Sequence, residues 1–195
     1  MLSTPYVIDG KKIYDYACTS ELKGNSGTTM CGIGTFVHEF GHVLGLPDFY
    51  ATNGADHPTL GSWDVMDAGP YNNAGRTPPG YSAYERFFLG WLTPTVLSQP
   101  SLVTLESLLS TNKACLITES RIHNLNGSSP NPLQFIMLEN RQKVGWDAYL
   151  PGHGLLVTRV NYNASTWGAN TPNNIATALG VDIVEKDEIE QYYFR

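Results

Sequence analysis

Residues 35–50 read Thr-Phe-Val-His-Glu-Phe-Gly-His-Val-Leu-Gly-Leu-Pro-Asp-Phe-Tyr, and this stretch decides how the rest of the chain is interpreted. It contains His38, Glu39 and His42 in the order H-E-x-x-H. On a helix, His38 and His42 lie one turn apart on one face, where two imidazoles can hold a single zinc ion. Glu39 then lies beside the first ligand and can reach a water on the metal without being a ligand itself.

The helix that carries this motif is expected to begin between Gly32 and Thr35 and to end at Leu44. Gly45 suits a left-handed C-cap, and a proline follows two residues later. Gly41 inside the helix costs about 1 kcal/mol relative to alanine, so we expect close packing at that position or a need for room around the ligands. Apolar residues surround much of the helix, which predicts that it is mostly buried. They are Ile33, Phe36, Val37, Phe40, Val43 and Leu44.

Asp48 follows six residues after His42, and the turn at Gly45 can bring it back towards the histidines as a third ligand. Local chain closure places Asp48 near the metal at little entropic cost. Two alternatives remain open at this point. Asp48 can instead be a helix-terminus or calcium carboxylate, and Asp64 or Glu85 can complete the site from another segment.

The composition excludes several classes of protein. The 195 residues are 42% hydrophobic and 15% charged, which argues against a disordered chain. The net charge is −6 with no basic cluster, so nucleic acid is not expected as a partner. No apolar run approaches 18 residues, so no membrane span is expected. Cys18, Cys31 and Cys115 do not form a disulfide framework, although Cys18 and Cys31 are either a pair or free thiols.

The remaining segments predict an α+β fold. Residues 6–17 are typical of a hairpin turning at Asp9-Gly10, and residues 81–91 of a helix with Ser82 as N-cap. The intervening residues 51–80 lack periodicity, and such long loops are usually functional. Beyond a boundary near residues 95–100, short apolar runs separated by Gly, Asn, Ser and Pro predict an antiparallel β region. These runs are 96–97, 102–105, 114–118, 134–139, 154–161 and 181–185, and Glu139 and Arg141 are expected to form a structural pair on one of them.

Three motifs together resemble a known family. They are His38-Glu-Phe-Gly-His-Val-Leu-Gly-Leu-Pro-Asp48, then Gly61-Ser-Trp-Asp-Val-Met66, then Leu89-Gly-Trp-Leu. The chain is similar in these motifs to the M6 family of secreted bacterial metallopeptidases, the immune inhibitor A-like group of metzincin-like zinc peptidases. The resemblance covers nearly the whole chain, is strongest over residues 17–93, and continues through Leu138-Glu-Asn-Arg141 and Gly152-His-Gly154.

The resemblance implies a fold and a set of roles. Residues 1–95 would be a partial catalytic domain with a metzincin-like zinc helix, and residues 96–195 an antiparallel β domain truncated at its C-terminus. His38, His42 and Asp48 would bind zinc, Glu39 would be the general base, and Met66 would be the Met-turn residue beneath the ligands. Most metzincins carry a third histidine where this chain has Asp48.

The expected function is that of a zinc-dependent endopeptidase, secreted or on the cell surface, which hydrolyses protein substrates through a zinc-bound water. Tyr71, five residues after Met66, is a candidate oxyanion donor, and Asp56, Asp64 and Asp67 are candidate calcium ligands. Only 37 residues precede His38, so the upper part of the cleft is expected to be missing. The alternative is an inactive or incomplete fragment that acts as a zinc-stabilised binding module. Both chain ends are expected to be cut from a longer protein, since neither resembles a natural terminus or a signal peptide.

Overall fold

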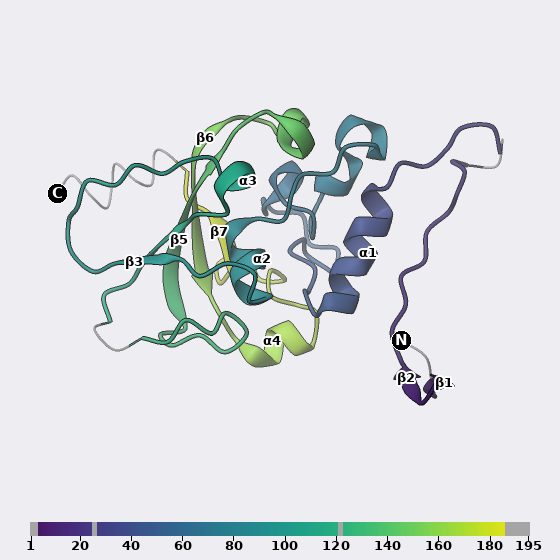
Figure 1. Ribbon diagram of the computed structural model, residues 1–195, viewed down its shortest axis with the longest axis horizontal. Helices are drawn as coiled ribbons and strands as arrows, with labels where there is room; N and C mark the ends of the chain where they lie inside the picture. The colour runs from purple at the N-terminus through teal and green to yellow at the C-terminus, as the bar shows by residue number, and fades with distance from the viewer. Residues whose placement is uncertain (1–3, 25–26, 121–122, 186–195) are drawn as a thin grey trace.

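The computed structural model describes residues 4–24, 27–120 and 123–185 and shows a mixed α+β fold with a five-stranded sheet (Figure 1). The strands are β1 (Tyr6–Ile8), β2 (Lys11–Ile13), β3 (Thr95–Leu97), β4 (Cys115–Ile117), β5 (Gln134–Arg141), β6 (Gly154–Asn161) and β7 (Val181–Ile183). The helices are α1 (Gly34–Leu44), α2 (Ala83–Phe88), α3 (Leu108–Thr111) and α4 (Ala164–Gly168), and 3-10 turns are η1 (Gly61–Trp63), η2 (Gly69–Gly75) and η3 (Gly145–Tyr149). The α+β class is confirmed, whereas a metzincin-like subdomain stays a prediction. Truncation was predicted at both ends of the chain, and residues 1–3 and 186–195 lie outside the described residues.

The N-terminal hairpin forms as predicted. β1 and β2 pair antiparallel, with Tyr6 opposite Ile13. Asp9 and Gly10 between them have φ angles of 49° and 75°, as a two-residue turn with both central residues left-handed requires. The second strand ends at Ile13 instead of continuing to residue 17. Figure 1 shows the hairpin at the tip of an extended arm, away from the sheet.

The main sheet has the order β3-β4-β5-β6-β7. β4 to β7 pair antiparallel, and the long central pair β5–β6 runs in register from Gln134 opposite Asn161 to Arg141 opposite Gly154. β3, however, is parallel to β4, so the prediction of an antiparallel β region is wrong at this edge. A parallel pair needs a long crossover, which residues 98–114 provide. The strand predicted at 102–105 is absent for the same reason, because these residues belong to the crossover.

α1 has the predicted length, but the prediction that it is mostly buried is wrong. Its buried residues are Gly34 and Gly41. Phe36 and Phe40 are 45% and 42% exposed and stack on each other on the outer side, with ring centroids 6.0 Å apart. Apolar residues around a helix predict burial only if another element covers each face. Here the inner side packs against η2 and the loop before α2, and nothing among the described residues covers the outer aromatic pair.

One hydrophobic core joins the two parts of the chain. Tyr84 of α2 contacts Phe49 from the loop after α1, Phe135 of β5 and Trp167 of α4, with ring centroids 6.0–6.4 Å apart. α2 therefore lies between the sheet and α1 (Figure 1). The proposed domain boundary near residue 95 stays a prediction, and residues on both sides of it contribute to this core.

α2 begins as predicted and is held by its own cap. The hydroxyl of Ser82 accepts a hydrogen bond from the Glu85 amide, and the Glu85 carboxylate accepts one from the Ser82 amide at 2.5 Å. This reciprocal capping box satisfies two amides that the first turn would otherwise leave unpaired. Across the described part of the chain, no helix has the length and apolar character needed to cross a membrane.

Candidate metal centre

α1 directs His38 and His42 towards a common point. Nδ1 of His38 lies 2.9 Å from the carbonyl oxygen of Val65, and Nδ1 of His42 lies 2.9 Å from that of Leu46. A carbonyl oxygen only accepts hydrogen bonds, so each Nδ1 carries the hydrogen. Both Nε2 atoms are thereby free to face the same space, which is the arrangement that zinc-binding histidines use.

The turn after α1 returns the chain to these histidines. Gly45 has φ +102°, a conformation that favours glycine, and its amide donates to the His42 carbonyl at 3.0 Å. Three residues later, Oδ1 of Asp48 lies 3.2 Å from Nε2 of His38 and 3.2 Å from Nε2 of His42. The three predicted ligands therefore meet at one place, with all of their ligand atoms within 4.8 Å of one another.

Asp48 has the features of a metal-binding carboxylate. It is 4% exposed, and its Oδ1 accepts no hydrogen bond of normal geometry. Zinc bound tetrahedrally with bonds of about 2.0 Å separates its ligand atoms by about 3.3 Å, close to the observed 3.2 Å spacings. Two imidazole nitrogens and one carboxylate oxygen are also a donor set that zinc accepts. The residues present therefore fit zinc.

The electrostatics of this group point the same way. Burial alone would raise the pKa of Asp48, but the close approach of His38 and His42 to Oδ1 and the hydrogen bond from Asn170 to Oδ2 hold it well below its usual value. The pKa of His42 is raised, chiefly by its close contact with Asp48. Burial opposes a charge on His38, but Asp48 and the Val65 carbonyl outweigh it, so the pKa of His38 is raised as well. Because both histidine pKa values are raised, a metal ion would compete with protons for these nitrogens.

The turn at residues 64–66 lies directly beneath α1. The Met66 amide donates to Asp64 Oδ1 at 2.8 Å, and the Met66 carbonyl accepts from the Phe49 amide at 2.8 Å. The Met66 side chain is fully buried, and a Cβ at position 41 would collide with its sulfur. The close packing predicted at Gly41 is confirmed, and Met66 is the group that causes it. The turn thus contacts both α1 and the loop that carries Asp48.

A residue that sequence reasoning missed holds Asp48 from the other side. Asn170 follows α4, and its Nδ2 donates to Asp48 Oδ2 at 2.7 Å. Its Oδ1 accepts a hydrogen bond from the Asp48 amide at 2.6 Å. These residues are 122 positions apart, so no local spacing pointed to the contact. The only available signal was the local excess of asparagine at 170, 173 and 174.

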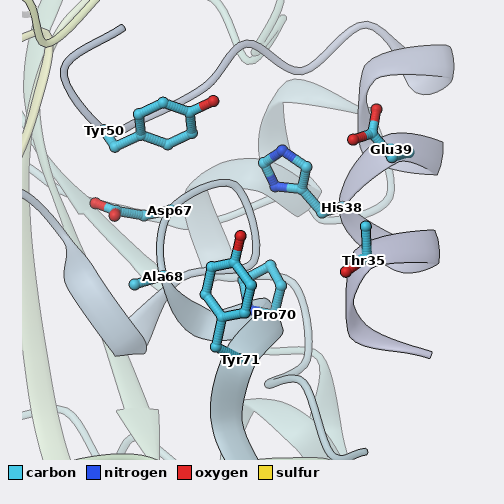
Figure 2. A pocket seen from close by; sticks show the side chains of 8 residues that line it. All are labelled: Thr35, His38, Glu39, Tyr50, Asp67, Ala68, Pro70 and Tyr71. Atoms are coloured by element: carbon cyan, nitrogen blue, oxygen red, sulfur yellow. The ribbon is translucent and has the colours of Figure 1, made fainter. Parts of the chain in front are cut away.

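A cavity of about 320 Å³ opens beside the histidines. Figure 2 shows Thr35, His38 and Glu39 projecting from α1 on one side, with Tyr50 and Tyr71 on the other. Asp67, Ala68 and Pro70 complete the lining. Its volume is in the range of small-molecule and peptide subsites. The predicted general base and the predicted oxyanion donor therefore face the same cavity as one of the histidines.

Tyr50 is a second functional candidate that sequence reasoning missed. Its ring stacks at 23° on that of His38, with centroids 6.4 Å apart. Burial, followed by the charges of Asp48 and Glu39, raises the pKa of Tyr50 to about 12, so its hydroxyl keeps its proton at neutral pH. Tyr71 is 74% exposed and is placed by the loop at η2. The position of Tyr50 two residues after Asp48 was the signal that could have indicated it.

The other candidate ligands do not join this group. Asp64 and Glu85 are fully buried away from the cavity, and all three cysteines are free. The proposed calcium residues do not gather either. Asp56 is exposed, Asp64 bonds the Met66 amide, and Asp67 Oδ2 accepts from the Gly61 amide at 2.8 Å. Calcium thus finds no support in the residues that the structure describes.

A second polar group lies deeper, against the sheet, and we call it the buried carboxylate cluster. It consists of Asp64, Glu85, Glu139 and Asp147 with Arg141. Arg141 binds Asp147 through two nitrogens at 2.8 and 2.9 Å and approaches Glu139 at 3.4 Å. The structural pair predicted for Glu139 and Arg141 is therefore confirmed. All of these side chains are less than 4% exposed.

The cluster holds more carboxylates than its arginine can neutralise. Burial raises the pKa of Asp64 to about 7, and the nearby charge of Asp67 adds to the rise. Burial and repulsion from Asp64 raise the pKa of Glu85 well above its usual value. One oxygen each of Glu85 and Glu139 has no hydrogen-bond partner. The raised pKa values of Asp64 and Glu85 therefore favour their protonated forms within this cluster.

Comparison with known proteins shows that part of this chain is similar to a known family. The family model described as "Immune inhibitor A peptidase M6, catalytic domain" matches residues 12–91. A stretch of 59 residues, 29% of this chain, is 39% identical to immune inhibitor A of Bacillus thuringiensis subsp. alesti and covers 9% of the length of that relative. No solved structure matches the chain. The residues that the family model matches include α1, the Asp48 loop and the turn at 64–66, so the resemblance seen in the motifs is confirmed, and residues 12–91 are similar to the catalytic domain of the M6 peptidases.

Proposed function

We propose that this chain carries the metal-binding centre of a zinc-dependent endopeptidase that hydrolyses peptide bonds in protein substrates. The observation that carries the proposal is the convergence of His38, His42 and the otherwise unpartnered Oδ1 of Asp48 beside a cavity that Glu39 lines. The family match supports the same reaction class, because it falls on the residues that form this centre.

Nε2 of His38, Nε2 of His42 and Oδ1 of Asp48 would hold the zinc. When bound, zinc lowers the pKa of a coordinated water and polarises the scissile carbonyl group. The protein fixes the ligand orientation through the Val65 and Leu46 carbonyls, which hold the two imidazole rings by their Nδ1 hydrogens. These outer contacts keep Nε2 of each ring available.

Glu39 has the position of a general base. It follows His38 directly on α1 and lines the cavity, so its carboxylate can accept the proton of the attacking water. The same carboxyl group can then deliver that proton to the leaving amine as the peptide bond breaks. Each transfer needs Glu39 within hydrogen-bonding reach of the reacting atoms, a requirement that a side chain on a rigid helix meets at low entropic cost.

Tyr71 is proposed as a donor to the oxyanion that develops on the carbonyl oxygen. Its hydroxyl faces the cavity in Figure 2 from the side opposite Glu39. A donor directed at the developing negative charge stabilises the transition state more than the substrate.

The non-enzymatic alternative, a zinc-stabilised binding module, differs in its ligand count. A structural zinc is closed by four protein ligands, whereas a catalytic zinc keeps one position for water. The group found among the described residues has three ligands and no cysteine, which favours the enzyme. We further propose a secreted or cell-surface setting and protein or peptide substrates, in keeping with the family resemblance.

The test is zinc analysis combined with casein cleavage by the full chain. We expect one zinc per chain, and cleavage that a chelator abolishes and added zinc restores. Glu39→Gln should keep its zinc and lose activity by about 10²–10⁴-fold, because only proton transfer is removed. Glu119→Gln, which changes an exposed glutamate, serves as the matched control. Unchanged cleavage by zinc-loaded Glu39→Gln would disprove the assigned base, and zinc binding without chelator-sensitive cleavage would favour the binding module.

A further inference from the structure

The carboxylate of Asp48 is held by two reciprocal hydrogen bonds to a single side chain. Asn170 Nδ2 donates to Asp48 Oδ2 at 2.7 Å, while Asn170 Oδ1 accepts from the Asp48 amide at 2.6 Å. An amide group can supply both a donor and an acceptor, which neither a carboxylate nor a hydroxyl of the same reach can do in this arrangement. The two bonds fix the rotation of the Asp48 carboxylate relative to its own backbone.

This fixed rotation separates the two oxygens of Asp48 by role. Oδ2 is occupied by Asn170, whereas Oδ1 lies 3.2 Å from each histidine Nε2 and accepts no hydrogen bond of normal geometry. One oxygen is therefore kept for the metal, and the other cannot rotate into its place without breaking the bond to Asn170. Contacts of this kind orient a ligand before the metal arrives.

Asn170 is itself held in place. It has φ +58°, a left-handed conformation that asparagine tolerates better than most residues. Its backbone amide donates to the Trp167 backbone carbonyl at 3.1 Å, and its backbone carbonyl accepts from the Thr52 hydroxyl at 3.0 Å. Thr52 is four residues beyond Asp48, so the two loops are tied at more than one point.

A second asparagine, Asn173, attaches the loop at 170–174 to the sheet. Asn173 is fully buried, and its Nδ2 donates to the carbonyls of Phe49 and Val181 at 2.8 Å each. Its Oδ1 accepts from the amides of Gly180 and Val181 at 3.0 Å. The residue next to Asp48 is thereby bonded, through one asparagine, to the first residue of β7.

From these contacts we infer that Asn170 is a positioning residue for the metal centre. The loop at 170–174 thereby makes the orientation of Asp48 depend on the β region. The inference rests on the proposed zinc function of His38, His42 and Asp48. It assigns a role to residues that lie outside the family match at 12–91. The predicted consequence is a lower zinc affinity, not a loss of fold, when the Asn170 side chain is removed.

The test compares zinc affinity in Asn170→Gly with wild type, measured by competition against a chromophoric chelator. Glycine keeps the left-handed backbone while removing both hydrogen bonds. We expect an affinity loss of about 10–100-fold, as for other residues that orient a metal ligand. The melting temperature of the metal-free protein should change far less than that of the zinc-loaded protein. The visible spectrum of the Co²⁺ form should change as well, a readout that a purely structural role would not move.

Asn73→Gly provides the matched control, because Asn73 is another left-handed asparagine with φ +50° that bonds Thr77 and not Asp48. It should keep wild-type zinc affinity. Equal affinity in wild type and Asn170→Gly, with zinc bound by both, would overturn the role of Asn170 and leave the zinc site standing. If wild type binds no zinc, the metal site fails and this inference fails with it. Asn170→Ser, which is too short to make both contacts, should repeat the glycine result.

Discussion

The candidate metal centre and the buried carboxylate cluster are two polar groups in which burial has opposite outcomes for the pKa of a carboxylate. In the candidate metal centre, the close approach of two histidines and the hydrogen bond from Asn170 outweigh burial and keep the pKa of Asp48 low. In the cluster, burial dominates and raises the pKa of Asp64 to about 7. The first group adjoins a cavity, whereas every side chain of the second is less than 4% exposed. The Asp48 carboxylate therefore stays ionised and can bind a cation, whereas the Asp64 carboxyl group favours its protonated form.

The two groups are joined by one residue. Asp64 belongs to the cluster, but its Oδ1 also accepts the amide hydrogen of Met66, whose side chain lies against α1 at Gly41. The cluster therefore holds the turn at 64–66, which packs against α1, without contacting His38, His42 or Asp48. This division predicts that changes in the cluster alter stability and leave the chemistry of zinc binding in the folded protein nearly unchanged.

The largest effect is expected for Arg141→Met. Arg141 is fully buried and is the partner of both Asp147 and Glu139, so its removal leaves two buried carboxylates uncompensated. Breaking a buried ion pair in this way costs about 3–5 kcal/mol. Urea unfolding at neutral pH measures the loss, and zinc affinity of the fraction that remains folded should stay within a few-fold of wild type. A variant of wild-type stability would show that the cluster does not depend on its arginine.

A comparable effect that depends on pH is expected for Asp64→Asn in the metal-free protein. The pKa of Asp64 is 3.8 in the unfolded reference and about 7 in the fold, so the folded state holds a proton that the unfolded state releases. Its contribution to stability is fully present below pH 3.8 and is lost as pH rises through about 7. Each tenfold change in proton affinity corresponds to about 1.4 kcal/mol, so the variant should gain up to about 4 kcal/mol over wild type across this range.

Urea unfolding at several pH values between 4 and 8 measures this gain. Asparagine at position 64 still offers an oxygen to the Met66 amide, so the turn at 64–66 should survive. Asp56→Asn, at an exposed position in the preceding loop, controls for the simple loss of a charge. A difference between wild type and Asp64→Asn that does not grow with pH would contradict the raised pKa.

A smaller effect, this time on the metal centre, is expected for Gly41→Ala. Alanine normally favours a helix by about 1 kcal/mol over glycine, but here its Cβ would meet the buried Met66 sulfur, and overpacking costs about 1–3 kcal/mol. We expect net destabilisation and weaker zinc binding, because α1 or the turn at 64–66 must move. Gly168→Ala, at the end of α4 with open space around it, is the matched control and should be neutral or stabilising. Thermal melting without zinc measures the loss of stability, and the further rise in melting temperature on adding zinc measures the weaker binding.

Local features of the fold were predictable because their causes lie within a few residues. The hairpin at Asp9-Gly10, the end of α1 at Gly45 and the capping box at Ser82 each depend on backbone preferences of short segments. The placing of His38, His42 and Asp48 depends on one helix and one turn, so sequence spacing was enough to bring these three residues together.

Features that depend on distant partners were not predictable in this way. Exposure of Phe36 and Phe40 depends on what covers α1, and the parallel pairing of β3 with β4 depends on the path of the crossover between them. Asn170 is far from Asp48 in sequence, and its role follows only from how α4 packs against the core. A single sequence carries little information about such contacts, since many loop asparagines have no structural partner.

The smallest effect is expected for Lys113→Met, which removes an ion pair at the protein surface. Lys113 Nζ lies 2.6 Å from Glu106 Oε2, a shorter contact than any made by Arg141, but the two side chains are 66% and 53% exposed. Water and salt screen such pairs, and holding two long side chains costs entropy, so the change in unfolding free energy should be below about 1 kcal/mol. Urea unfolding in low and high salt measures it. A loss as large as that of Arg141→Met would mean that contact distance, and not burial, determines what an ion pair contributes to this fold.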